Sequence, residues 1–308
     1  MNNSITKKDT LLIVVGIIVT ILIFYILLQY VDLQQMLQLF SKTEKWFILP
    51  ALLISLTAKF FLAPFKWFRL LKFYHQTISF KETFLIWAAM TPMRAIFPLK
   101  SGALLHAVYL NRHHEVDWSK GVSSVVFDKF YNLLALLSLV PLAVIFLQIP
   151  LSIKIPTIIL FLLFLILLFF GIGIRGAWSK LVPTLPTISF SQKLELFIMA
   201  LIFQLSDVLV FFLVFKSLNS TPPFGMMLLY IPLAGIISNI PITIMGIGSR
   251  EALLLVLFKS LYSPETLLGA GIIFSFVSYF ITALAGLPFM LPFIKTWFQK
   301  KRDINFLK

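Results

Sequence analysis

The sequence contains no cysteine, and only 12% of its 308 residues are charged. The absence of cysteine excludes disulfides, catalytic thiols and cysteine-ligated zinc. Soluble domains carry about 25% charged residues, so this chain has too few charges to cover a water-exposed surface. Apolar residues make up 59% of the chain, and the mean hydropathy is +0.97. These values exclude intrinsic disorder, a secreted disulfide scaffold and a cytosolic enzyme, and they predict an all-α protein embedded in lipid.

Acidic residues are also scarce, with 12 Asp and Glu against 26 Lys and Arg, which gives a formal net charge of +14. The basic residues separate apolar runs and do not gather in one module. We therefore interpret them as contacts with anionic lipid headgroups at the membrane surface. A nucleic-acid partner is not expected.

Six apolar runs are long enough to cross a bilayer, which requires about 20 helical residues. They are Leu11–Leu28, Trp46–Phe65, Gly121–Leu147, Ile155–Ile174, Leu196–Phe215 and Thr266–Ile294. The first run resembles a signal peptide, but bulky and polar residues follow it in place of a small-residue cleavage site. We expect it to be a retained anchor, and the sequence therefore predicts a polytopic protein with about six transmembrane helices.

Two further apolar stretches, Thr83–Leu110 and Phe224–Phe258, are interrupted by proline, glycine and charge at 91–102 and 239–251. A broken helix leaves backbone polar groups unpaired, which lipid does not tolerate unless protein or a water-filled cavity satisfies them. We therefore predict two re-entrant helical hairpins. With the N-terminus in the cytoplasm, this topology places 16 Lys and Arg residues on the cytoplasmic side, five opposite, and five within helices or hairpins. Such a bias predicts that both termini are cytoplasmic.

The order span, hairpin, span occurs at 46–147 and again at 196–294, and the first hairpin enters from the cytoplasm while the second enters from outside. The start of the span lies 56 residues before Gly102 in one unit and 52 residues before Gly248 in the other. An inverted repeat with broken helices is typical of transporters. The alternative is that the two interruptions arose independently. The polar stretches are too short for a soluble domain, so we expect one integral membrane domain over 1–308.

The string Gly246-Ile-Gly-Ser-Arg-Glu251 is the strongest candidate for an anion site. Glycines let the backbone turn close to a ligand, and Ser249 is expected to cap a helix over Arg250–Phe258 whose N-terminal N–H groups point into the protein. Arg250 adds a forked donor suited to phosphate or carboxylate. The alternative is that Arg250 pairs with an acidic residue and only fastens the hairpin.

The first hairpin offers a counterpart in Arg94, Lys100, Ser101 and Gly102, followed by a helix that carries His106. Basic side chains and glycines suit contact with an anionic headgroup. Two alternatives stay open, because Lys100 is able to extend to the membrane interface and His106 is equally suited to a packed core.

Charged residues also lie inside the apolar runs: Asp128, Lys129 and Asn132 on one turn, and Asp207 deep in a later span. A charge at the bilayer centre costs about 2.5–3.5 kcal/mol, so both aspartates need partners such as Lys129, Lys59 or Arg250. Two interpretations remain open. These residues form structural ion pairs between helices, or they line a path for proton coupling or headgroup binding.

Four segments resemble the flippase-like transmembrane domain of bacterial lysylphosphatidylglycerol synthases. They are Lys66-Trp-Phe-Arg-Leu-Leu71, Pro98-Leu-Lys-Ser-Gly102 through His106, Val126-Phe-Asp-Lys-Phe-Tyr-Asn132, and Gly246–Glu251. The family's hairpin Glu is Ala103 here, its following Arg is His106, and its Glu-Arg-Asp positions read Asp128, Lys129 and Asn132. These departures bear on headgroup preference.

The resemblance implies a lipid translocator in the bacterial plasma membrane that binds a phospholipid or polyprenyl-phosphate headgroup between the two hairpins. Its expected partners are lipids with anionic headgroups, and no cofactor or metal is expected. The expected substrate-binding residues are Arg250, Glu251, Gly246, Gly248, Ser249, Arg94, Lys100, Gly102, His106, Asp128, Lys129, Asn132 and Asp207.

Catalysis is not expected, because the sequence 1–308 contains no catalytic motif. It also contains no counterpart of the soluble aminoacyl-transferase domain found in the family's full-length enzymes. Two alternatives are kept. One is an integral-membrane lipid transferase that uses Glu82, Glu115 and Asp117 near His113 and His114. The other is an accessory subunit that presents lipid to a separate synthase. Association with such a synthase or with a second copy of the chain is left open.

Overall fold

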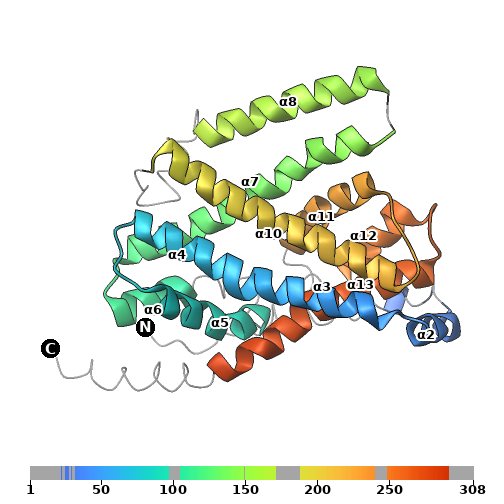
Figure 1. Ribbon diagram of the computed structural model, residues 1–308, viewed down its shortest axis with the longest axis horizontal. Coiled ribbons are helices and arrows are strands. Elements are labelled where there is room, and N and C mark those ends of the chain that lie inside the picture. The colour runs from blue at the N-terminus through green and yellow to red at the C-terminus, as the bar shows by residue number, and fades with distance from the viewer. Residues whose placement is uncertain are drawn as a thin grey trace.

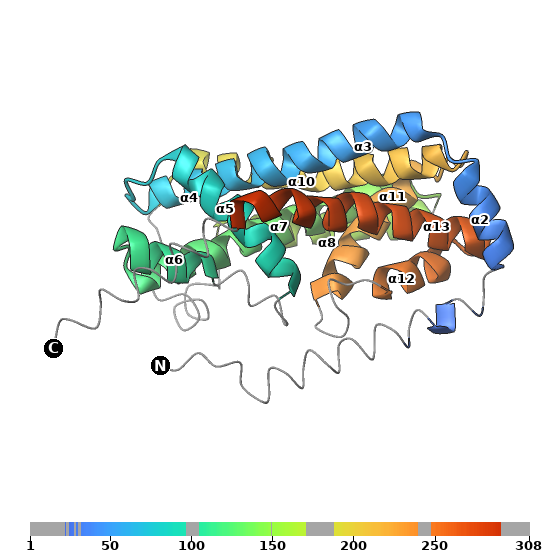
Figure 2. The same cartoon turned by 90° about the horizontal axis from the view of Figure 1, so that it is seen from below.

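The computed structural model describes residues 32–96, 105–148, 150–170, 188–239 and 248–290, together with Leu22, residues 25–27 and Gln29. Every regular element within these ranges is a helix. The longest helices lie side by side along the long axis of the molecule (Figures 1 and 2). The all-α fold class is thereby confirmed.

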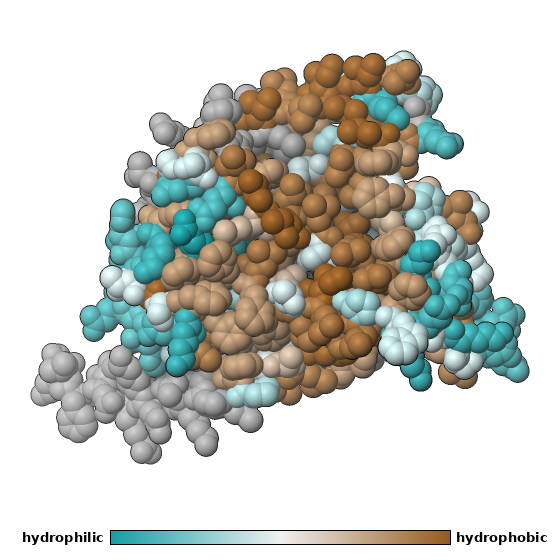
Figure 3. All heavy atoms as spheres, viewed as in Figure 1, coloured by the Kyte–Doolittle hydropathy of each residue, from teal (hydrophilic) through white to brown (hydrophobic). Residues whose placement is uncertain are grey.

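Four helices are long and apolar enough to cross a membrane: Lys45–Phe73, Trp118–Phe146 (α7), Phe190–Ser217 (α10) and Pro264–Met290. They correspond to four of the six expected spans. The run Ile155–Ile174 is covered as far as residue 170 by α8 (Leu151–Phe170). Most of Leu11–Leu28 lies outside the described residues. In Figure 3 an apolar surface covers the middle of the molecule and polar side chains gather at both ends, as a membrane-spanning protein requires.

The observed spans begin before the apolar runs because polar residues cap them. The Asp117 carboxylate accepts hydrogen bonds from the backbone N–H groups of Ser119 and Lys120, so α7 begins at Trp118. Ser189 forms a reciprocal capping box with Gln192 at the start of α10. Ser263 caps the helix that starts with Pro264, a residue suited to the first helical position. The caps satisfy N–H groups that would otherwise be orphaned near the membrane interface.

Two of the spanning helices contain a π-helical turn. The helix Lys45–Phe73 consists of α3 (Lys45–Thr57), the first π turn (Ala58–Leu62) and α4 (Ala63–Phe73). The helix Pro264–Met290 consists of α13 (Pro264–Ser275), the second π turn (Phe276–Phe280) and a last helical segment. Pro64 is the second residue after the first π turn, and the wider turn accommodates a residue that lacks an N–H group. Single π turns inside α-helices are frequent at functional sites.

Two pairs of shorter helices lie where the hairpins are expected. They are α5 (Phe80–Ile96) with α6 (Leu105–His114), and α11 (Phe224–Asn239) with α12 (Ser249–Phe258). The chain between the helices of each pair, residues 97–104 and 240–247, lies outside the described residues. In Figures 1 and 2, α5 and α11 run toward the middle of the molecule from its opposite ends.

The helices fall into two series of matching lengths. The first series, from Lys45 to Phe146, has helices of 29, 17, 10 and 29 residues. The second series, from Phe190 to Met290, has helices of 28, 16, 10 and 27 residues. Each series therefore consists of a long helix, two short helices and another long helix.

The two series interlock through close helix crossings at glycines. Gly235 of α11 lies against Leu136 of α7, so α11 of the second series packs on α7, the last helix of the first series. Gly286 of the last helix lies in turn against Ala88 and Pro92 of α5. A glycine lets two helix backbones approach closely, which favours packing inside a membrane. Thus α11 contacts the last long helix of the first series, and α5 contacts the last long helix of the second series.

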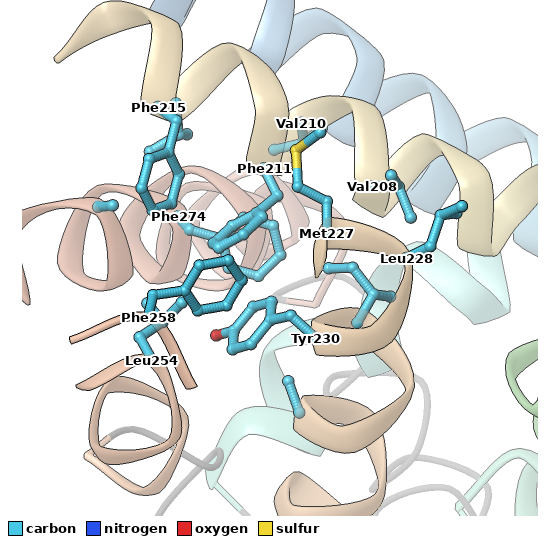
Figure 4. Packing of buried hydrophobic residues seen from close by; sticks show 14 of the residues in the cluster. Val208, Val210, Phe211, Phe215, Met227, Leu228, Tyr230, Leu254, Phe258 and Phe274 are labelled. Carbon is cyan, nitrogen blue, oxygen red and sulfur yellow. The ribbon is translucent and has the colours of Figure 1, made fainter. Parts of the chain in front are cut away.

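The buried core has two main clusters. In the second series, rings and aliphatic side chains from α10, α11, α12 and α13 pack together around Phe211, which stacks on Tyr230 with ring centroids 4.5 Å apart (Figure 4). The first-series cluster includes Trp67 and Trp87. Two helices lie at the periphery in Figure 1: α2 (Leu33–Ser41), capped by Asp32 and packed on α13, and α8, which packs on α7.

The crossing at Gly286 yields a test of this packing. A Cβ at this position would lie 2.6 Å from Pro92 Cδ and 2.8 Å from the Ala88 carbonyl oxygen, and neither is a flexible side-chain end. We expect Gly286→Ala to lower the free energy of unfolding by about 1–3 kcal/mol, despite the better helix propensity of alanine. Thermal unfolding in detergent measures the change.

The matched control is Gly269→Ala in the same helix. Its Cβ would approach the side chains of Leu39 and Phe40 no closer than 3.3 Å, and these side chains have room to adjust. This variant should match or slightly exceed the wild-type stability. Equal destabilisation by both substitutions would contradict the close crossing at Gly286.

Candidate functional site

The first polar cluster, here the Lys66 cluster, consists of Lys66, Asp128 and Asn132. Lys66 Nζ lies 3.0 Å from Asp128 Oδ1 and donates a hydrogen bond of 2.5 Å to Asn132 Oδ1. Asn132 Nδ2 donates to Asp128 Oδ2 at 3.3 Å, which closes the cluster. The side chains of Lys66 and Asp128 are only 3% and 5% exposed. The ion pair therefore fastens α4 to α7 in an environment that screens charge weakly.

The position of Lys66 corrects the end of the expected span Trp46–Phe65, because the helix continues to Phe73. The sequence analysis counted Lys66 among cytoplasmic loop residues, whereas the structure places it inside a helix that continues to Phe73. The partner of Asp128 is thus a residue that was not among the expected ones. Lys129, on the neighbouring position of α7, is exposed.

Trp67, the residue after Lys66, contacts three further helices. The indole N–H of Trp67 donates to Ser124 Oγ at 3.2 Å. The His106 imidazole, 2% exposed, contacts both Trp67 and Trp87, with centroid distances of 4.8 and 5.2 Å. Four elements, α4, α5, α6 and α7, thus meet around His106. This arrangement agrees with the interpretation of His106 as a packed core residue, and it connects the imidazole through Trp67 with the helix that carries Lys66.

The second polar cluster, here the Tyr279 cluster, consists of Tyr279, Arg250, Lys59 and Asp207. It joins the two series. The Tyr279 ring of the second π turn has the Arg250 guanidinium carbon 4.0 Å and Lys59 Nζ 4.7 Å from its centroid. Lys59 Nζ lies 3.6 Å from Asp207 Oδ1, which confirms Lys59 as a partner of Asp207. Arg250 is only 1% exposed. A cation over an aromatic face is stabilised more strongly when it is removed from water, so the ring orders both basic side chains.

Glu251 holds the start of α12. Its Oε2 accepts the Gly248 backbone N–H at 2.6 Å, and its Oε1 accepts the Ser275 hydroxyl at 2.7 Å. Gly248 has a φ of 90°, a conformation that L-residues with side chains rarely adopt. The cap of α12 is therefore Gly248, and Ser249 is the first helical residue, which corrects the expected cap by one position. Gly271 leaves room for the Glu251 side chain, since a Cβ there would lie 2.7 Å from Glu251 Cγ.

Tyr230 adds a polar group that the sequence analysis missed. The side chain is fully buried, and among the described residues its hydroxyl has no hydrogen-bond partner. The hydroxyl lies within electrostatic range of Arg250, Glu251 and Tyr279. In Figure 4 the Tyr230 ring stacks under Phe211, and its oxygen points out of the aromatic stack on the side of α12. A buried hydroxyl normally has a partner, so this one suits a ligand or water.

Twelve of the thirteen expected site residues separate into three groups, and the remaining one, Lys129, is exposed on α7. Arg250, Glu251, Gly248, Ser249 and Asp207 lie on the elements that form the Tyr279 cluster. His106, Asp128 and Asn132 lie at the Lys66 cluster. Gly246, Lys100, Gly102 and the side chain of Arg94 lie outside the described residues. The sequence did contain one signal for the missed residues: Lys66 has the same need for a buried partner as Asp128.

Two of the three carboxylates considered for a transferase, Glu82 and Asp117, have structural roles in the described structure. Glu82 accepts hydrogen bonds from the backbone N–H and hydroxyl of Ser79, which lower the pKa of its carboxyl group. Asp117 caps α7. The His113 ring stacks on Tyr109, with centroids 4.3 Å apart. Within the described ranges, no group of three or more His, Asp or Glu side chains is placed to hold a metal ion.

The Lys66 cluster predicts an unequal response to loss of one partner or both. Lys66→Met leaves the Asp128 carboxylate buried without its cation and should lower the free energy of unfolding by about 3–5 kcal/mol. The double variant Lys66→Met, Asp128→Asn removes both charges and should regain most of that loss. Thermal unfolding in detergent distinguishes the two.

The exposed pair of Arg69 and Glu195 provides the control. Arg69 donates to Glu195 in a two-pronged contact at 37% and 27% exposure, so Arg69→Ala should cost no more than about 1 kcal/mol. An equal loss from Lys66→Met and Arg69→Ala would contradict the burial of the Lys66 pair.

Comparison with known proteins gives one family. No curated protein matches the chain at a significant level. Residues 13–286 match the family described as lysylphosphatidylglycerol synthase TM region, and this range covers most of the 308 residues and both polar clusters. The match agrees with the multi-pass helical fold and connects the chain with a membrane lipid-related function. The chain belongs to the family of lysylphosphatidylglycerol synthase transmembrane regions.

Proposed function

We propose that this protein is a lipid translocator that binds an anionic headgroup at the start of α12 and moves it between the membrane leaflets. The observation that carries the proposal is the position of Arg250, a fully buried guanidinium at the N-terminal end of α12. Buried cations in membrane proteins mark substrate paths by default. The substrate class is a phospholipid or a polyprenyl phosphate.

The surroundings of Arg250 support an anionic ligand. The N-terminus of α12 contributes a partial positive charge and N–H donors. The Tyr230 hydroxyl offers a further donor, and the Tyr279 ring holds the guanidinium in place. Both Glu251 oxygens already accept hydrogen bonds from Gly248 and Ser275, so Glu251 serves to shape the turn. These groups together favour a phosphate over a cationic headgroup.

An inverted repeat explains how a headgroup would cross. The matched helix lengths support two related halves, and the short pairs α5–α6 and α11–α12 support two re-entrant hairpins that enter from opposite faces. Reciprocal packing of α5 and α11 on the opposite series supports the same arrangement. In such proteins, movement of one repeat against the other exposes a central site to each side in turn.

The proposal also gives the basic residues of the first hairpin a role in headgroup binding. Arg94, Lys100 and Gly102 of the first hairpin would approach the same headgroup from the cytoplasmic side, with His106 and the Lys66 cluster behind them. We place the protein in a bacterial plasma membrane with both termini in the cytoplasm, because of the bias of Lys and Arg toward one side. Its partners are anionic membrane lipids.

Reconstitution with fluorescent phosphatidylglycerol tests the function. Wild-type proteoliposomes should equilibrate the labelled lipid between leaflets faster than empty vesicles. Arg250→Lys keeps the charge but loses the forked geometry, so we expect a rate at least about tenfold lower. Lys259→Ala, at the exposed C-terminal end of the same helix, should keep the wild-type rate. Equal rates in wild-type, Arg250→Lys and empty vesicles would refute translocation of this lipid class.

The opposed hairpins predict opposite labelling of single cysteines. Because the chain has no cysteine, Ser101→Cys and Ser249→Cys can each be probed with a membrane-impermeant maleimide. Ser101→Cys should react from the cytoplasmic face, and Ser249→Cys should react at least partly from the other face. Labelling of both cysteines from one face only would refute the inverted arrangement.

A further inference from the structure

The ammonium of Lys59 lies among oxygen atoms from three helices. Its Nζ donates to the Ser278 backbone carbonyl at 2.6 Å and to Ser55 Oγ at 3.3 Å, and lies 3.6 Å from Asp207 Oδ1. The Tyr279 ring covers the ammonium from 4.7 Å. The Lys59 and Asp207 side chains are each 14% exposed. A carbonyl, a hydroxyl and a carboxylate thus surround one positive charge.

The backbone of the second π turn offers a carbonyl oxygen to a cation. The Ser278 carbonyl lies in the second π turn, where the α-helical hydrogen-bond pattern is interrupted, and it also accepts the Thr282 hydroxyl at 2.9 Å. Carbonyls of interrupted helices coordinate Na⁺ or H⁺ carriers in membrane transporters. Hard cations prefer such uncharged and carboxylate oxygens.

The Ser278 side chain provides an independent sign of an unsatisfied polar group in this part of the core. This side chain is 0% exposed, and its hydroxyl has no hydrogen-bond partner among the described residues. A buried hydroxyl without a partner is unusual and indicates a place for water or an ion. The carbonyl of the same residue accepts the hydrogen bond from the Lys59 ammonium.

We propose that the Lys59 ammonium occupies a built-in site for a monovalent cation, and that removal of its side chain converts this position into a sodium site. Asp207 would supply the charge, and the Ser278 carbonyl and Ser55 hydroxyl would supply neutral ligands. The Lys66 cluster differs, because its contacts to Asp128 and Asn132 include no backbone carbonyl. The proposal does not depend on lipid translocation, since occupancy of the site is a binding property of the folded protein.

Occupancy of this site would influence how the two series meet. Lys59 belongs to the first series, whereas Asp207 and Ser278 belong to the second. The cation thus bridges the first π turn, the second π turn and α10. The Tyr279 ring also contacts Arg250, so the cation site and the proposed headgroup site share one side chain.

Thermal unfolding of the full chain in detergent tests the proposal, with sodium chloride compared against choline chloride at equal concentration. Lys59→Ala should unfold at least about 3 °C higher in 150 mM sodium chloride than in choline chloride, because binding to the folded state stabilises it. Wild-type protein, whose site is filled, should show no such difference. The double variant Lys59→Ala, Asp207→Asn should lose the sodium effect, and Lys259→Ala should behave as wild type.

A second variant, Lys59→Ser, guards against failure of the alanine variant to fold, because its hydroxyl offers the sodium ion one more oxygen. A sodium-specific rise in either variant, absent from the wild type and from the double variant, supports the proposal. Equal midpoints in sodium and choline for both variants, or failure of both to fold in sodium, overturns it. A rise of the same size in wild-type protein also overturns it, because sodium would then bind elsewhere.

Discussion

The cost of a charge in a low-dielectric interior governs this structure. Lys66, Lys59 and Arg250 all lie within the helical bundle, and each is held by oxygen atoms or an aromatic ring that belongs to another helix. Such contacts have direction and fixed distance, unlike the contacts of leucine and phenylalanine with lipid or with one another. The polar contacts therefore specify which helices meet and in what register, while the apolar residues keep the bundle in the membrane.

The two polar clusters connect different helices of the molecule. The Lys66 cluster lies within the first series, because it connects α4 with α7. The Tyr279 cluster crosses between the series, because Lys59 comes from the first and Asp207, Arg250 and Tyr279 come from the second. A displacement of one series against the other would leave the first cluster intact and change the second. The two π turns lie at this boundary, and single π turns of this kind are frequent at functional sites.

The sequence predicted the helical class and six membrane spans, four of which are found among the described residues, because long apolar runs identify such helices. It also pointed to Arg250 and to the pair of Lys59 and Asp207. It placed Lys66 on the cytoplasmic side, because the apolar run Trp46–Phe65 ends directly before this residue. Only the three-dimensional packing of α4 on α7 reveals that this lysine is buried. Tyr230 and Tyr279 were missed for a related reason, since one tyrosine among many aromatic residues carries no signal in the sequence.

The position of α8 has a consequence for the membrane around the protein. This helix packs on α7 and otherwise exposes apolar side chains such as Leu151, Ile159 and Leu160, which are 60% or more exposed (Figure 1). Its 20 residues correspond to about 30 Å, close to the thickness of a hydrocarbon layer. A helix with few protein neighbours meets hydrophobic mismatch by tilting, at a cost of a fraction of a kcal/mol per ångström. In bilayers of different thickness α8 would therefore tilt first, and the interlocked helices that carry both polar clusters would keep their packing.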